Sequence, residues 1–220
     1  MKFKTLLTVA ACLTSAANIY AGQLSASSTL SSMYYVNGEQ VSDKIASETE
    51  LAYSTKFGSA TVTPSIKYDV YDKTGESSKS TMALGVSAPM SGVSLSAGVA
   101  KDSYEKSTVK DTDKLLLGVS GKINTVDLAF DLKYSNKFKG GKKFYNYALS
   151  GSAPVGKATA GLAFGHNDYK AAADGTNNTY YTVSMSYPLS KGIDLGISYT
   201  GHNKSVDYKD KAAVFLKTSA

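Results

Sequence analysis

Hydrophobic and polar residues alternate along most of this chain with a period of two. Successive side chains of a β-strand point to opposite sides, so this alternation indicates strands with one apolar and one polar face. A clear example alternates Val126, Leu128, Phe130, Leu132 and Tyr134 with Asp127, Ala129, Asp131 and Lys133. About a dozen segments after residue 22 repeat the pattern and none has a helical period, which predicts an all-β protein.

The charged residues of these segments lie on the polar face of the predicted strands. The main members of this set are Glu48, Glu50, Lys67, Asp69, Asp127, Asp131 and Lys133. Within the predicted strands, the apolar face carries no Asp, Glu or Lys. A soluble secreted β-sandwich would also give each strand one apolar face, so the alternation alone leaves that alternative open.

Short and long connections alternate between the predicted strands. Short turns are indicated near Gly58 and at residues 89–92, 121–124, 154–156 and 188–192, starting 31 to 34 residues apart. Longer polar connections are expected at residues 37–44, 72–79, 101–113, 136–143, 167–178 and 203–211. This repeat predicts six hairpins with all the long loops at one end. Because lipid offers the backbone no hydrogen-bond partner, a sheet that spans a membrane must close. The prediction is a closed antiparallel transmembrane β-barrel of about 12 strands.

Aromatic residues gather where the predicted strands meet the long connections. The candidates for such a girdle are Tyr34, Tyr68, Tyr134, Tyr145, Tyr147, Tyr181 and Tyr199. A phenol with one dry and one wet end suits the boundary between membrane and water.

The first 21 residues have the features of a signal peptide. Lys2 and Lys4 precede an apolar stretch, residues 6–17, that is too short to span a bilayer, and Ala21 offers a cleavage position before Gly22. We therefore expect a signal peptide at residues 1–21 and the barrel at residues 22–220. An alternative is a lipoprotein signal, residues 9–12, in which Cys12 would be acylated. Cys12 is the single cysteine, so the exported chain would have no disulfide.

These features together resemble the small porin-like β-barrels of Gram-negative outer membranes, and the resemblance covers residues 22–220. It implies a location in the outer membrane, contact with its lipid and with the assembly machinery, periplasmic short turns and extracellular long loops. It also implies a passive channel for small hydrophilic solutes. The chain departs from the family in its last residues, 215–220, which do not end on the aromatic residue that the assembly machinery reads.

The polar face of a twelve-stranded barrel would line a lumen whose width depends on side-chain size. Many of these positions are small, as in the series Thr81, Ala83, Gly85 and Ser87. The candidates for a lumen constriction are Glu48, Glu50, Lys67, Asp69, Asp127, Asp131 and Lys133, with Glu50 opposite Lys67 across a hairpin. Both signs of charge occur, which predicts weak charge selectivity. Mutual neutralisation of these side chains is the alternative, and it fits a closed barrel that is structural or acts through its loops.

Composition narrows the possible functions further. All 24 positive charges are lysines and the formal net charge is +6, so the chain lacks the guanidinium groups that nucleic-acid readers use, and no nucleic-acid partner is expected. A basic loop cluster at Lys137, Lys139, Lys142 and Lys143 could contact lipopolysaccharide phosphates or simply be solvated. The two histidines, His166 and His202, are expected at the rim. Barrel phospholipases have a Ser two positions from the His, which neither His has here, so no catalytic, metal or cofactor site is predicted.

Overall fold

The computed structural model describes residues 22–36, 39–42, 44–73, 76–105, 111–136, 143–170, 177–202 and 211–220. The predicted signal peptide and the alternative at Cys12 lie outside these residues, as do Lys137, Lys139 and Lys142. For Tyr34 only the backbone is described. In the described part of the chain, no helix has the length and hydropathy needed to cross a membrane.

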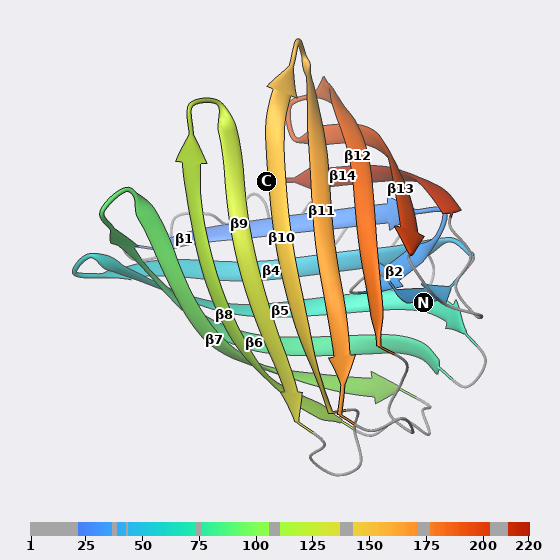
Figure 1. The fold of residues 1–220 in the computed structure, drawn as a ribbon, viewed down its shortest axis with the longest axis horizontal. Helices are drawn as coiled ribbons and strands as arrows, with labels where there is room; N and C mark the ends of the chain where they lie inside the picture. Colours follow the sequence, from blue (N-terminus) through green and yellow to red (C-terminus); the bar gives the residue numbers. More distant parts are fainter. Residues whose placement is uncertain are drawn as a thin grey trace.

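Twelve strands form one closed antiparallel barrel, in the order β1-β14-β13-β12-β11-β10-β9-β8-β7-β6-β5-β4 (Figure 1). The strands are β1 (Gly22–Ser31), β4 (Ala46–Phe57), β5 (Ala60–Lys73), β6 (Glu76–Met90), β7 (Val93–Glu105), β8 (Thr112–Ile123), β9 (Val126–Asn136), β10 (Phe144–Val155), β11 (Ala158–Tyr169), β12 (Asn178–Ser190), β13 (Ile193–His202) and β14 (Lys211–Ser219). A separate two-stranded sheet is formed by β2 (Tyr34–Val36) and β3 (Glu39–Ser42). The predicted fold is confirmed, and the β-sandwich alternative is wrong.

The barrel closes where the first strand meets the last. Residues 27–31 of β1 pair with residues 215–219 of β14. Next to this segment, the backbones of Ala26 and Ala220 exchange two hydrogen bonds of 3.2 and 3.0 Å. These pairs remove the free edge that lipid could not satisfy. The seam has five register pairs, whereas β10 and β11 share twelve.

The predicted short turns are confirmed at one end of the barrel. The turn after β6 places Ser91 at φ 47° and Gly92 at φ 86°. Two successive residues with positive φ match the type I′ turn, which joins twisted strands over two residues. Asn124 and Gly58 also have positive φ values, 54° and 61°.

Several long connections are shorter than the sequence predicts. Strand β7 continues to Glu105 and β8 begins at Thr112, so Lys101 and Asp113 belong to strands rather than to a loop. Both face outward, in register with Met82. The expectation of an outer face without charge is therefore wrong at these strand ends. The physical reason is that a strand can continue pairing above the membrane, where its outer face no longer needs to be apolar.

Between the strand ends the outer wall is mostly apolar and the inner wall mostly polar, the reverse of a soluble protein. Large outward side chains such as Met82, Leu149 and Ile197 are 64%, 55% and 59% exposed. The cross-strand register places Glu48, Lys67 and Asp69 on the opposite face, toward the lumen.

Candidate functional site: the lumen of the barrel

The charged side chains of the lumen form ion pairs on the wall made by β4 to β8. Lys67 Nζ lies 2.6 Å from Glu48 Oε2 and 3.7 Å from Asp69 Oδ1. Lys79 Nζ approaches the other oxygen of Asp69, Oδ2, at 2.9 Å. Asp69 is completely buried, and an isolated buried carboxylate would be costly. Two ammonium groups therefore stabilise this charge.

A second buried carboxylate, Asp102 on β7, is satisfied in the same way. Its Oδ2 lies 2.5 Å from Lys114 Nζ, and its Oδ1 accepts a 2.9 Å hydrogen bond from Thr81 Oγ1. The hydroxyl of Tyr104 donates to Oδ2 at 3.4 Å. Asp102 is 1% exposed, so these donors replace nearly all of its contact with water.

The wall made by β10, β11 and β12 carries amides at the same end. Asn146 Nδ2 donates to Asn167 Oδ1 at 2.8 Å, and Asn167 Nδ2 donates to Asn178 Oδ1 at 3.2 Å. Asn146 Nδ2 also donates to the hydroxyl of Tyr180 at 3.2 Å. All three amides are at most 2% exposed. We call Asn146, Asn167 and Asn178 the amide ladder.

A glycine allows the ring of Tyr180 to lie against this wall. A Cβ at Gly165 would stand 2.1 Å from the ring carbon Cζ of Tyr180. The close approach of ring and backbone is therefore possible only without a side chain at this position. This close approach holds the Tyr180 hydroxyl beside the amide ladder.

The two ends of the lumen differ in packing. Near the long loops, Asp69, Asp102 and the amide ladder are buried; we call this the packed half. Near the short turns, inward side chains such as Ser96, Ser120 and Asp131 are exposed; we call this the open half. Lys122 and Asp127 form an ion pair of 3.2 Å there, with side chains 59% and 60% exposed. The lumen is thus solvated at one end and filled with side chains at the other.

The predicted constriction residues divide between these halves. Glu50 stands opposite Lys67 in the register, as predicted. The ammonium of Lys67 nevertheless pairs with Glu48, its diagonal neighbour, and there it is also close to Asp69. Glu48, Lys67 and Asp69 belong to the packed half. The other predicted residues are spread along the inner face of β9: Asp127 and Asp131 in the open half, and Lys133 between Leu116 and Asn146.

The sequence pattern does not indicate Lys79, Asp102 and Lys114 as lumen residues, nor does it indicate the amide ladder. Lys79 and Asp102 lie in polar stretches, which the pattern predicts as loops. A usable signal was present, since Lys79 continues the alternation of Thr81, Ala83 and Gly85, and the register puts Asp102 beside Thr81.

Several tyrosines of the predicted girdle contact one another on the outer wall. The rings of Tyr134 and Tyr145 are 4.8 Å apart, those of Tyr145 and Tyr147 are 6.2 Å apart, and those of Tyr181 and Tyr199 are 6.0 Å apart. Tyr68 also faces outward, next to Ile66 and Val70, and its hydroxyl lies 3.4 Å from Glu105 Oε2.

Two lysines lie next to these tyrosines, at the long-loop ends of β10 and β11. The backbone oxygen of Lys143, the one described member of the predicted basic cluster, accepts a 3.2 Å hydrogen bond from the Lys170 N–H. Lys170 Nζ lies 2.6 Å from Asp168 Oδ2, and this hydrogen bond raises the pKa of Lys170. Lys170 Nζ also lies 4.9 Å from the ring centre of Tyr145.

The two histidines lie on opposite faces of the barrel wall. His166 is outside, with its Nδ1 2.9 Å from the Thr179 hydroxyl, whereas His202 faces the lumen beside Tyr180. Both lie near the long-loop ends of their strands, at the rim where the sequence predicts them. Within the described ranges, no group of three His, Cys, Asp or Glu side chains has the geometry of a metal site.

Comparison with known proteins identifies the family. Residues 8–207 match the family described as Gram-negative porin. A search of curated proteins finds no match. Three solved structures are similar over most of their length. The KdgM porin covers 88% of this chain and 98% of its own, with 10% identity and a TM-score of 0.56. An outer-membrane channel from Pseudomonas putida F1 covers 92% and 96%, with 14% identity and a TM-score of 0.59.

The third similar structure is an enzyme, the outer membrane phospholipase A of Escherichia coli. It covers 92% of both chains, with 12% identity and a TM-score of 0.58. At such identities a structural likeness shows the fold alone. The family match spans most of the 220 residues, and the apolar outer wall and closed barrel agree with it. The chain therefore belongs to the Gram-negative porin family and forms a porin-like channel barrel of the outer membrane.

Proposed function

We propose that this barrel is a narrow passive channel for small hydrophilic solutes and that the packed half sets its selectivity. The observation that carries the proposal is the lumen itself, which is polar along its length, solvated at the short-turn end and filled with side chains at the other. A solute entering the open half meets the ion pairs of the packed half before it can leave.

The pathway runs along the charged wall rather than along the amide ladder. The side chains of Glu48 and Lys67 are 37% and 28% exposed, and Lys114 is 15% exposed. The members of the amide ladder are at most 2% exposed. Water therefore reaches the charged wall, and a solute would follow the same contacts.

The channel is expected to discriminate weakly between anions and cations. Each buried carboxylate has an ammonium neighbour, so neither sign dominates the constriction. Selection by size and polarity then outweighs selection by charge.

We also propose that the protein is not an enzyme, although phospholipase A shares its fold. His166, on the outer wall, is hydrogen-bonded to a threonine, and no third group that orients this histidine is seen in the described part of the chain. A nucleophilic site needs a base, a nucleophile and a group that orients the base.

We also propose that the predicted signal peptide, residues 1–21, directs the export of the chain.

Planar-bilayer recording of the refolded protein tests the channel. Discrete openings that are similar in potassium chloride and in salts with one bulky ion would support it, whereas a strong preference for one sign would contradict weak selectivity. Protein that folds, as shown by heat-modifiable gel mobility, but gives no openings would contradict the channel. That result would favour a closed barrel that acts through its loops, which the burial in the packed half also supports.

A further inference from the structure

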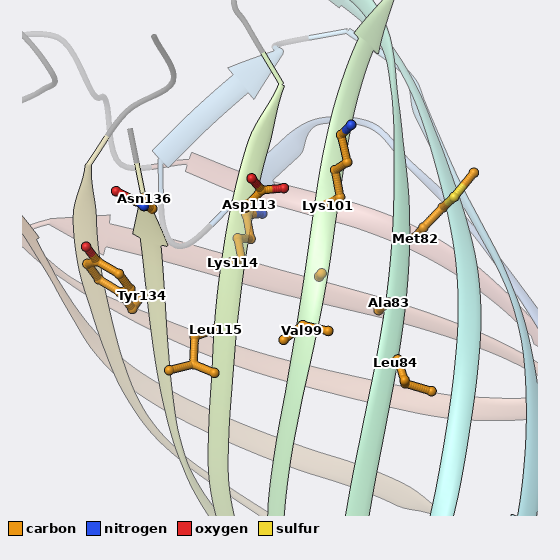
Figure 2. A pocket seen from close by; sticks show the side chains of 11 residues that line it. Met82, Ala83, Leu84, Val99, Lys101, Asp113, Lys114, Leu115, Tyr134 and Asn136 are labelled. Atoms are coloured by element: carbon orange, nitrogen blue, oxygen red, sulfur yellow. The ribbon is translucent and has the colours of Figure 1, made fainter. Parts of the chain in front are cut away.

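A cavity of about 280 Å³ lies on the lumen side of strands β5 to β9, between the open half and the packed half. Figure 2 shows the outer side of β6 to β9, where Leu84 and Val99 point away from the barrel. Successive side chains of a strand alternate between its two faces, so the chain neighbours Gly85 and Gly98 face the lumen. The cavity lies over these glycines and includes none of the residues whose ion pairs are described above.

Two neighbouring rows of inward residues border the cavity. The row nearer the long loops joins Gly85, Gly98, Leu116 and Lys133 across β6 to β9. The row nearer the short turns joins Ser87, Ser96, Gly118 and Asp131. Each row therefore ends on a charged residue of β9, with opposite signs in the two rows. The two charged residues are separated by about 7 Å along the strand, since they are two positions apart.

A glycine leaves room for a solute beside the carboxylate. A Cβ at Gly118 would stand 2.5 Å from Ser96 Oγ and 3.0 Å from Asp131 Oδ1. Both oxygens therefore lean over Gly118, and no side chain at this position fills the space between them. A donor group that lies just above Gly118 is within hydrogen-bond reach of both.

Asp131 supplies a negative charge that no direct contact neutralises. Its side chain is exposed, and in the described part of the chain it forms no hydrogen bond or ion pair. Asp127, two inward positions away along β9, differs because Lys122 pairs with it at 3.2 Å. An ammonium group of a solute can therefore donate to Asp131 without breaking a contact within the protein. A second hydrogen of the same ammonium can go to the Ser96 hydroxyl.

Lys133 supplies a positive charge on the other side of the cavity. Its half-buried side chain borders the cavity from the row nearer the long loops, and no ion pair joins it to Asp131. A solute with only a negative charge would be repelled by Asp131, and one with only a positive charge would be repelled by Lys133. A solute with both charges satisfies both residues.

We propose that this cavity is a binding site for small zwitterions, namely α-amino acids with a short side chain. The ammonium of the solute donates to Asp131 Oδ1 and to Ser96 Oγ above Gly118. Its carboxylate accepts a hydrogen bond from the ammonium of Lys133, and its carbon atoms lie against Leu116. The inference rests on the proposed channel, because solutes must enter the lumen, and it names the class of solute.

Saturation-transfer NMR of the refolded protein in detergent micelles measures binding at equilibrium and needs no conduction. The probes are L-serine, glycerate, ethanolamine and glycerol. Glycerate has a hydroxyl in place of the ammonium, ethanolamine lacks the carboxylate, and glycerol has neither charge. We expect L-serine to bind about tenfold more tightly than glycerate or ethanolamine, because each of these lacks one hydrogen bond between charged groups. The proposal is overturned if L-serine does not bind, or if one of the other three solutes binds as tightly.

Three variants assign the two ends of the solute. Asp131→Asn keeps the size of the side chain and should remove the preference for L-serine over glycerate. Lys133→Gln should remove the preference for L-serine over ethanolamine. Asp194→Asn changes an inward carboxylate of β13 outside the cavity, so it is the matched control and should alter neither preference. A wild-type preference over glycerate in Asp131→Asn would also overturn the proposal.

This proposal and the proposed channel can fail separately. Openings in a planar bilayer from protein that does not bind L-serine would overturn the site alone. Binding of L-serine by folded protein that gives no openings would overturn the channel alone. The comparison of the four solutes uses the unchanged protein, so it decides the question even if a variant does not fold.

Discussion

The packed and open halves of the lumen contain the same kind of ion pair in opposite surroundings. In the packed half, Lys114 and Asp102 are 2.5 Å apart and their side chains are 15% and 2% exposed. In the open half, Lys122 and Asp127 are 3.2 Å apart and are 59% and 60% exposed. If one partner is removed, water can take its place in the exposed pair, Lys122 and Asp127, but not in the buried pair, Lys114 and Asp102. Burial, rather than the presence of charge, is thus what distinguishes the packed half from the open half.

The largest effect is expected when one partner of the buried pair is removed. Lys114→Met leaves Asp102 buried without its ammonium and should lower the free energy of unfolding by about 3 kcal/mol. Lys122→Met, the matched change in the open half, should cost less than about 0.5 kcal/mol because exposed pairs contribute little. Urea unfolding in detergent micelles measures both. Equal losses for the two variants would contradict the difference between the halves.

A smaller effect is expected at the contact between Tyr180 and the wall. Gly165→Ala places a Cβ where the ring now lies, so the ring must move and the hydroxyl leaves Asn146. The expected loss of stability is about 1–2 kcal/mol. Gly85→Ala is the control, since its nearest neighbour, the backbone oxygen of Thr63, would be 3.7 Å away. The same unfolding assay applies, and a loss at Gly85 as large as that at Gly165 would argue against a packed half.

The smallest effect is on ion preference. Lys67→Gln removes a charge that water still reaches in the packed half, while Lys79 still pairs with Asp69, and it should shift the reversal potential toward cations. Asp127→Lys reverses a charge in the open half, where water and salt screen it, and should shift the potential much less. Recording both variants under a salt gradient measures the shifts. A larger shift for Asp127→Lys would locate the constriction at the other end.

Much of the fold was predictable because lipid imposes a simple rule on every strand. Outward positions must be apolar and all edges must pair, so alternation and turn spacing predict twelve strands and their closure. The strand ends were less predictable. Lys101 and Asp113 lie near the long-loop ends of β7 and β8, where the strands continue to pair although their outward residues are polar.

The lumen was predictable only in part. Glu48, Lys67 and Asp69 lie within apolar alternation, and their face follows from it. Asp102 and Lys79 lie in polar stretches that also fit loops. The amide ladder depends on the register of three strands, which no single segment specifies, and the burial of Asn146 depends on how Tyr180 packs over Gly165.

The most direct test of the central claim is the reactivity of one introduced thiol from the two sides of a bilayer. Ser96 is an exposed, inward residue of the open half, and Ser96→Cys is made with Cys12 changed to Ser so that it carries the single thiol. A charged, membrane-impermeant thiol reagent should modify it rapidly from the short-turn side and much more slowly from the long-loop side, read as a step in conductance. Equal rates from both sides would show that no constriction stands between Ser96 and the long loops, and would contradict this account.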